Sequence, residues 1–302
     1  MFTEQSFETV VIQYLKELNY DYIHGSNLTR DNKEVLLLKN LKENLIKINK
    51  EIPQTTIEYA IKRIQNFETK DVFTNNKLFH KYLTEGIEIS DFIDGKTVYH
   101  TVKLIDYDNI QNNTFLVVNQ LEIIEDDIKK IPDVIVYVNG MPLVCMELKS
   151  TSREEVTIED AYNQLMNYKE VHIPSLFYYN AFLIISDGVH TKAGTITAPF
   201  NRFMDWRKIN IDDDVISEPT VDYKNLDTLL YGMFDKERFL DIIKNFILFV
   251  PKGKILAQYH QYYGMKKAIN SVIKAVHSDG RAGVVWHTQG SGKSFSMTFL
   301  AG

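Results

Sequence analysis

The stretch that decides the fold runs from residue 131 to residue 150 and reads IPDVIVYVNGMPLVCMELKS. Two apolar runs flank Asn139-Gly140, and Asn-Gly between such runs is a strong signal for a β-hairpin. The pattern predicts strands over residues 134–138 and 143–148. Because residues 143–146 are apolar at every position, we expect the second strand to be buried on both faces inside a sheet.

Charged side chains follow the apolar part of this hairpin. Glu147 and Lys149 are two residues apart in a strand and therefore point to the same side, while Asp133 opens the partner strand. Two carboxylates and a lysine at one sheet end can hold Mg²⁺, which stabilises charge on a phosphate while the lysine positions or deprotonates the nucleophile. The alternative is a surface ion pair, because Glu-x-Lys alone is a common pattern.

The register of the hairpin tests this site. A plain two-residue turn that pairs Val138 with Met141 would set Asp133 opposite Met146 and turn Glu147 to the other face. Convergence of the two carboxylates needs one extra residue in the loop or in a strand. We therefore predict a three-residue or bulged turn, with Gly140 in a left-handed conformation.

Residues 287–294 read HTQGSGKS and form the second informative motif. Glycines at this spacing let backbone N–H groups approach phosphate oxygens, while the lysine and serine reach the β/γ-phosphates and a bound Mg²⁺. A buried strand over 282–286 and a helix from residue 295 would give the strand–loop–helix setting that such a loop requires. The residues predicted to bind the nucleotide are Gly290, Ser291, Gly292, Lys293 and Ser294. The alternative is a loop rich in glycine and serine by chance.

The phosphate loop departs from the full pattern because His287 stands where the first glycine would be, a form common in helicase-like motors. A nucleotide motor also needs an acidic motif on a later strand, and none follows in this sequence. We therefore expect a piece of a longer protein that carries the first motor motif and does not hydrolyse ATP by itself.

A helix is predicted over residues 157–169, with Thr157 and Asp160 as its capping box. Gln164 and Tyr168 are four residues apart and therefore neighbours on its surface. Tyr168 belongs to the apolar stripe, so a core aromatic is the alternative to a site residue. Gln164 flanks that stripe and could face the end of the sheet.

Composition limits the classes of protein to consider. The chain has 302 residues, a length typical of about two domains. Hydrophobic residues make up 44% of it, which is enough to form sizeable cores. Its formal net charge is −6, so binding to nucleic acid must come from local basic patches or from partners. The single cysteine, Cys145, excludes an intramolecular disulfide and fits a reducing cytoplasm. The sequence contains no run of about 18 apolar residues, so it predicts no membrane-spanning helix.

Periodicity gives the order of elements along the chain. Helices are predicted over residues 4–19, 33–50, 54–67, 224–233, 235–249 and 258–277. Further strands are predicted over 86–93, 96–106, 114–124, 181–186 and 189–195, with Asp94-Gly95 as a hairpin turn and 251–254 as a linker. This order predicts an α/β domain with a mixed central sheet flanked by helices, followed by the opening of a second α/β domain.

The combination of Asp133, Glu147-x-Lys149 and Gln164-x-x-x-Tyr168 resembles the PD-(D/E)xK nuclease fold, in the version with a QxxxY helix. Together with the downstream phosphate loop, it is similar to the R (restriction, HsdR-type) subunit of type I restriction–modification enzymes. In that family an N-terminal endonuclease domain precedes two RecA-like translocase domains. The resemblance implies an endonuclease domain over 1–255, including a helical linker, and the start of an ATP-dependent translocase over 256–302.

The resemblance also implies roles for individual residues. Asp133 and Glu147 would ligate Mg²⁺, Lys149 would be the catalytic lysine, and Gln164 with Tyr168 would support the site or contact DNA. In such motors a glutamine ahead of the phosphate loop reads adenine, and Gln261 matches it better than Gln258. Glu8 is a candidate to complete the nuclease site, although a solvated helix residue is the favoured interpretation.

The implied function is that of a type I site-specific deoxyribonuclease, which cuts double-stranded DNA after ATP-driven translocation stalls. The implied cofactors are Mg²⁺ and ATP, and the implied partners are DNA and the methyltransferase (M) and specificity (S) subunits. The alternatives are a nuclease–helicase fusion of the DNA-repair or type III-like kind, a catalytically inactive nuclease-fold docking module, and a plain phosphate-loop ATPase. Basic residues that could line a DNA path, if they are not ordinary solvated charges, are Arg202, Arg207, Lys208, Lys252 and Lys254.

Overall fold

A mixed six-stranded sheet forms the centre of the protein, as predicted. The computed structural model describes residues 4–93, 95–150, 157–213, 224–278, 280–286 and 288–301. The strands lie in the order β1 (Asp21–His24), β4 (Phe115–Asn119), β7 (Val134–Val138), β8 (Met141–Leu148), β9 (Phe182–Ser186) and β10 (Thr191–Gly194). The pairs β1–β4 and β8–β9 are parallel, and the other neighbours are antiparallel.

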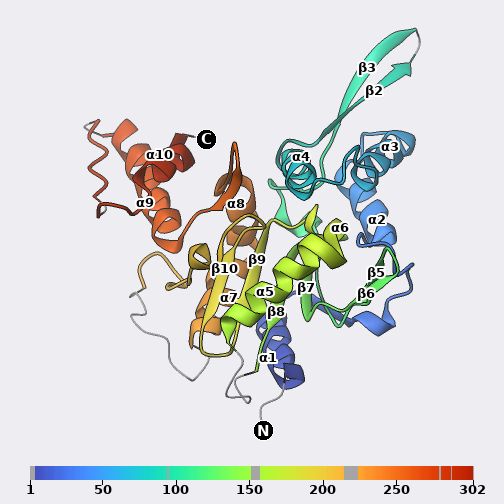
Figure 1. Ribbon diagram of the computed structural model, residues 1–302. Helices are drawn as coiled ribbons and strands as arrows, with labels where there is room; N and C mark the ends of the chain where they lie inside the picture. Colours follow the sequence, from blue (N-terminus) through green and yellow to red (C-terminus); the bar gives the residue numbers. More distant parts are fainter. Residues whose placement is uncertain are drawn as a thin grey trace.

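Helices cover both faces of this sheet (Figure 1). Helix α5 (Ile158–Asn167) packs on β8 and β9, while α1 (Glu4–Glu17) packs on β1, β4 and α7 (Lys224–Phe234). Every residue of β7 and β8 is buried, which for β8 confirms the prediction drawn from its continuous apolar run. Cys145 is one of these core residues and is a free thiol.

The hairpin of β7 and β8 contains the extra residue that the sequence argument required, but at a different place. Val138 pairs directly with Met141, so the turn has two residues, Asn139 and Gly140, both with positive φ. The prediction of a three-residue or bulged turn is therefore wrong. The register shifts between Val136 and Tyr137 instead. The bulge thus lies inside the hairpin, where packing decides it, and not at the turn, where residue type would reveal it.

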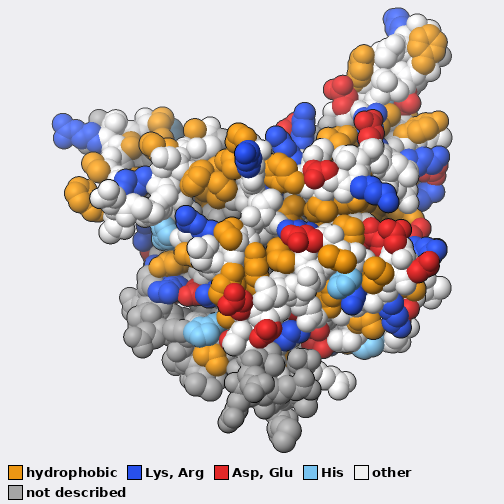
Figure 2. Space-filling model, in the orientation of Figure 1, with side chains coloured by type: hydrophobic (Ala, Val, Ile, Leu, Met, Phe, Trp, Pro, Cys, Tyr) orange, Lys and Arg blue, Asp and Glu red, His pale blue; other side chains and the backbone are white. Residues whose placement is uncertain are grey.

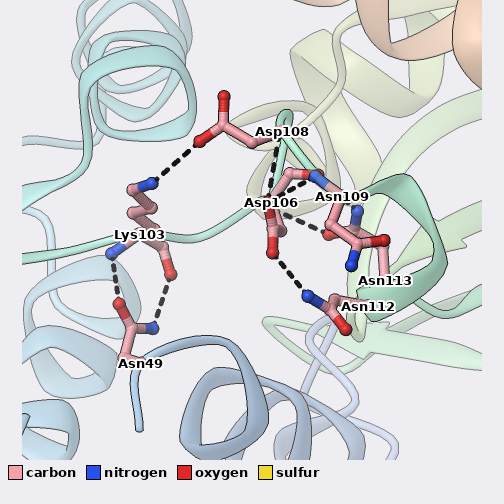
Figure 3. A network of polar contacts seen from close by, with 7 residues as sticks. All are labelled: Asn49, Lys103, Asp106, Asp108, Asn109, Asn112 and Asn113. Carbon is pink, nitrogen blue, oxygen red and sulfur yellow. Dashed lines mark hydrogen bonds and ion pairs between the residues drawn. The ribbon is translucent and has the colours of Figure 1, made fainter. Parts of the chain in front are cut away.

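A polar network locks this turn in place. Asn139 donates from Nδ2 to Leu104 O at 3.0 Å and to Asn113 Oδ1 at 2.8 Å, and its Oδ1 accepts from Thr114 N at 2.8 Å. Figure 3 shows the loop that supplies these groups, in which Asp106 accepts bonds from two backbone N–H groups and from the side chain of Asn112. The network fixes the end of the hairpin that is opposite to Asp133 and Glu147.

Between β1 and β4 the chain forms three α-helices and a projecting arm (Figure 1). The helices are α2 (Leu38–Ile48), α3 (Gln54–Gln65) and α4 (Val72–Glu85), of which α4 was not predicted although Asp71 caps it at Thr74 N. The arm is the antiparallel pair β2 (Ile87–Ile93) and β3 (Lys96–Val102), joined between Ile93 and Lys96. Asp94 of the predicted turn lies outside the described residues.

Two segments near residues 114–130 and 235–257 differ from the prediction. The expected strand over 114–124 is divided into β4 and β5 (Ile123–Glu125), with β6 (Ile128–Lys130) paired to the latter, because Gln120 has a φ of 52°. The expected helix over 235–249 is shorter, as α8 (Lys236–Asn245) followed by β11 (Ile247–Val250). The expected linker at 251–254 is instead the turn into β12 (Gly253–Leu256).

The C-terminal part contains α9 (Tyr259–Val276), the phosphate loop and α10 (Lys293–Ala301), gathered at the upper left of Figure 1. Residues 282–286 are not a strand, which contradicts the prediction; Val284 is 90% and Trp286 is 88% exposed. A strand needs hydrogen-bonded neighbours, and the described residues offer this segment none. Among the described helices, none has the length and apolar character needed to cross a membrane.

Candidate functional site

The candidate nuclease site lies where β8 ends and β7 begins. Val134 pairs with Met146, so the next position brings Asp133 and Glu147 to the same face of the hairpin. Glu147 is 0% exposed and Asp133 is 9% exposed. Asp133 Oδ2 accepts a hydrogen bond from Leu148 N at 2.8 Å, which ties the first carboxylate to the strand that carries the second.

Negative charge is concentrated in this buried pair of carboxyl groups. Burial, and next the neighbouring Asp133 carboxylate, raise the pKa of Glu147 well above its usual range. Lys149 opposes this effect, since its Nζ donates to Glu147 Oε1 at 2.8 Å. Glu147 Oε2 is buried and accepts no hydrogen bond from the described residues. A buried acceptor without a donor is costly, and a cation bound between the two carboxylates would satisfy it.

Lys149 is held in position by the neighbouring strand. Its backbone N–H donates to Ser186 O at 2.8 Å, which continues the parallel pairing of β8 with β9 past Leu148. Its side chain is 12% exposed, so the ammonium lies at the border between the buried carboxylates and solvent. This is where a lysine can orient or deprotonate a water that attacks a phosphate. The sequence did not predict that Ser186 accepts this hydrogen bond, because no sequence pattern connects it to Lys149.

The residues present fit Mg²⁺. This ion prefers oxygen ligands and commonly takes one or two carboxylates from the protein, with waters and substrate phosphate completing the shell. Asp133 and Glu147 supply two carboxylates, and the described residues contain no group of three or more His, Cys, Asp or Glu side chains that could hold a metal.

Gln164 lies on α5, and Tyr168, its predicted partner in the site, follows directly after this helix. Gln164 Nε2 donates to the Tyr168 hydroxyl at 2.7 Å, and Tyr168 is 6% exposed. Burial, and next the Glu147 carboxylate, raise the pKa of Tyr168 above its usual value. Because the hydroxyl oxygen already accepts from Gln164, its own proton can be donated toward the site. The predicted helix over 157–169 gives way to a π-helical turn, Tyr168–His172, at this tyrosine.

Glu8 is not a solvated helix residue, so the favoured prediction for it is wrong. It is 3% exposed and accepts hydrogen bonds at 2.8 Å from Asn119 Nδ2 and from Gln120 Nε2. Asn119 pairs with Val134, so its side chain is on the face of the sheet opposite to that of Glu147. Glu8 is therefore buried at the end of β4, where it bonds the side chains of two consecutive residues, Asn119 and Gln120.

The phosphate loop has the backbone freedom that its glycines predict. Gly290 and Gly292 have φ values of 84° and 75°, which disfavour any other residue. Gln261 Nε2 donates to Gly292 O at 3.2 Å, and a Cβ on Gly292 would approach that nitrogen to 2.7 Å. Lys293 Nζ bonds Thr288 O at 3.0 Å. His287 lies outside the described residues.

A cavity of about 470 Å³ lies beside the phosphate loop and Gln261. Its other wall consists of residues far away in the sequence, which sequence reasoning missed because only the fold brings them there. This wall includes Thr195, Thr197, Arg202, Trp206 and residues 253–257. Ser291 lines the cavity together with the two glycines.

The basic residues proposed for a DNA path do not form one stripe. Arg207 pairs with Asp205 at 2.9 Å, Lys208 Nζ bonds Ile211 O, and Lys254 is only 3% exposed. Lys254 as a solvated or DNA-lining charge is therefore wrong. Figure 2 shows Lys and Arg side chains interspersed with Asp and Glu over the visible face.

Comparisons with known proteins cover both parts of the chain. The family model for the type I restriction enzyme R protein N terminus matches residues 1–202, and that for the SWI2/SNF2 ATPase matches 260–302. The chain is 37% identical, over its whole length, to the type I restriction enzyme HindI endonuclease subunit of Haemophilus influenzae. It is also 37% identical, over 97% of its length, to the putative type I restriction enzyme MjaIXP endonuclease subunit of Methanocaldococcus jannaschii. It spans 30% of the length of each of these relatives.

Proposed function

Because the chain belongs to the type I restriction enzyme R protein family, we propose that it carries the Mg²⁺-dependent endonuclease centre of such a subunit. The observation that supports this most strongly is the pair Asp133 and Glu147 on one face of the hairpin, with an unsatisfied buried oxygen on Glu147. Lys149 contacts the same carboxylate at 2.8 Å. The reaction is hydrolysis of phosphodiester bonds in double-stranded DNA.

Each residue has a separate task in this proposal. Asp133 and Glu147 hold Mg²⁺, which, when bound, supplies positive charge to the phosphate in the transition state. Lys149 orients the attacking water by donating a hydrogen bond to its oxygen. Tyr168, fixed by Gln164, donates a hydrogen bond toward the acidic pair or the phosphate. The burial of the two carboxylates makes the site ineffective without the cation, because their negative charges repel the phosphate.

The phosphate loop gives the second part of the proposal. Gly290, Ser291 and Gly292 would present backbone N–H groups to the phosphates of ATP, and Lys293 would exchange Thr288 O for a phosphate oxygen. Ser294 would ligate the nucleotide's Mg²⁺, and Gln261 would read adenine at the mouth of the cavity. The cavity volume of about 470 Å³ is within the range of small-molecule sites.

The organisation that follows is an endonuclease unit over 1–255 and the start of a translocase unit at 256. In the assembled enzyme, with M and S subunits, ATP-driven translocation would stall before the nuclease cuts. The alternative of an inactive docking module would be favoured if Asp133 and Glu147 lay on opposite faces. The bulge between Val136 and Tyr137 gives the register that favours the nuclease.

Cleavage by the assembled restriction complex tests the proposal. Glu147→Gln keeps the size of the side chain and removes its charge, so we expect DNA cleavage to fall by at least about 100-fold. ATP hydrolysis by the same complex should stay within about twofold, because the phosphate loop is untouched. Glu159→Gln, in an exposed position on α5, is the matched control and should cut like the wild type. Normal cleavage by the Glu147 variant would refute the nuclease centre.

A further inference from the structure

Lys254 is a buried lysine that lies apart from the nuclease site, in the strand that forms one wall of the cavity beside the phosphate loop. It lies on β12, is 3% exposed, and donates from Nζ to Asn76 Oδ1 at 2.9 Å and to Asn180 O at 2.8 Å. The ring centroid of Phe249 is 5.2 Å from the same nitrogen. Burial lowers the pKa of Lys254 well below its usual range, and no carboxylate of the described residues is among the causes of this shift.

Burying this ammonium group lowers the stability of the fold. A buried ammonium loses hydration that two neutral oxygens and one aromatic ring replace only in part. An apolar side chain of similar length would fill the same space without this cost. The hydrogen bonds of Lys254 are therefore better explained by the elements that they join than by the stability that they add.

The elements joined are the nuclease unit and the strand that leads into the nucleotide-binding part. Asn76 belongs to α4, and Asn180 stands just before β9, the strand whose other end holds the backbone of Lys149 at Ser186. The backbone of Lys254 is fixed as well, since its carbonyl accepts from Thr195 Oγ1 at 2.7 Å.

On its other side, Lys254 is close in sequence to the phosphate-loop contacts. Residues 253–257 line the cavity, and Gln258 begins α9 through a capping box with Gln261. Gln261 then bonds Gly292 O in the phosphate loop. A displacement of β12 from α4 and β9 would thus move one cavity wall and the glutamine that faces the nucleotide.

We propose that Lys254 is a positioning residue that fixes β12, and with it the wall of the nucleotide cavity and the start of α9, onto the nuclease unit. The role of the cavity in nucleotide binding rests on the function proposed above. The fixation itself rests only on the contacts of Lys254 with Asn76 and Asn180.

The test compares the full chain with Lys254→Met, which keeps the apolar stem and removes the donor. Lys252→Met is the matched control, because Lys252 is exposed in the same hairpin. Lys254→Gln is the conservative variant, because it restores a neutral donor. Hydrogen exchange followed by mass spectrometry reports on local opening, and titration with a fluorescent ATP analogue reports on the cavity.

We expect amides of β11, β12 and the first turn of α9 to exchange about tenfold faster in Lys254→Met, while those of β7, β8 and β9 change by less than about twofold. Affinity for the ATP analogue should fall about five- to tenfold, and Lys254→Gln should recover part of both effects. Lys252→Met should match the wild type.

Two results would overturn the proposal. One is faster exchange spread evenly over the whole sheet, or loss of folding, because Lys254 would then be an ordinary core residue. The other is unchanged exchange in β12. If the local exchange effect is present but the wild type does not bind the ATP analogue, the positioning role stands and the proposed nucleotide site fails.

Discussion

At the scale of single residues, the main feature of the candidate site is the electrostatic repulsion between two buried carboxylates. Two carboxylates meet at Asp133 and Glu147, and the Lys149 ammonium contacts the second of them. Residue spacing in the sequence was sufficient to identify these three residues, because strand periodicity is strict. It was not sufficient for Glu8, since burial of that helix residue depends on Asn119 and Gln120, more than a hundred positions away.

This repulsion predicts that a substitution that abolishes cleavage will also stabilise the metal-free fold. In the presence of EDTA, Glu147→Gln should raise the free energy of unfolding by about 1–3 kcal/mol, because it removes the repulsion between two buried carboxylates. Urea unfolding of the variant and of wild-type protein measures this. Adding Mn²⁺ should stabilise the wild type and leave the variant almost unchanged. A variant that is less stable than the wild type without metal would contradict the charge assignment.

Tyr168 gives the second prediction at this scale. Tyr168→Phe keeps the ring and removes the hydroxyl that contacts Gln164, so DNA cleavage should fall by about 10- to 100-fold with little loss of stability. Val171→Ser, a change at an exposed position of the same π-helical turn, is the control. Cleavage kinetics of the assembled complex decide the matter; equal rates for Tyr168→Phe and wild type would leave Tyr168 as a core aromatic.

At the scale of elements, the sequence predicted the strands that turn residues and apolar runs define. It did not predict the position of the bulge, or that a segment without a neighbouring strand stays irregular. Strand β7 was predicted with its observed bounds, since its apolar run is bounded by a turn signal. The need for an extra residue was correct, but its place between Val136 and Tyr137 depends on packing against both neighbouring strands. The segment 282–286 was expected to be a strand, and composition cannot supply the neighbours that a strand requires.

The turn of the hairpin carries the prediction at this scale. Gly140 has a φ of 83°, and a Cβ there would meet Leu37 O and Leu41 N at 2.7 Å. Gly140→Ala should therefore lower the free energy of unfolding by at least about 2 kcal/mol through backbone strain and a clash with α2. Gly95→Ala, in the open turn of the arm, has a similar φ of 78° without any such contact and should cost less. Chemical denaturation of both variants compares them; equal losses would mean that the contact with α2 adds nothing.

At the scale of the whole molecule, buried basic groups make the fold sensitive to acid. Burial, and next the nearby Lys254, lower the pKa of His80 well below 6.5. The unfolded chain therefore takes up a proton below about pH 6.5 when the folded chain does not. This stability is present above that pH and is lost as the pH falls toward the folded pKa.

Between about pH 7.5 and pH 5.5, the wild type should lose about 1 kcal/mol more stability than His80→Gln, which cannot titrate. Urea unfolding at the two pH values measures the difference. An equal pH dependence for both proteins would show that His80 takes up its proton in the folded state.

The central claim is that Asp133 and Glu147 form a divalent-metal site on one face of the β7–β8 hairpin. The most direct measurement is a crystal of this chain soaked in Mn²⁺, with anomalous density recorded near Asp133. We expect one peak ligated by both carboxylates, with the Lys149 ammonium beside it. The absence of a peak, with Glu147 turned to the other face of the hairpin, would contradict the account and leave the domain without a nuclease centre.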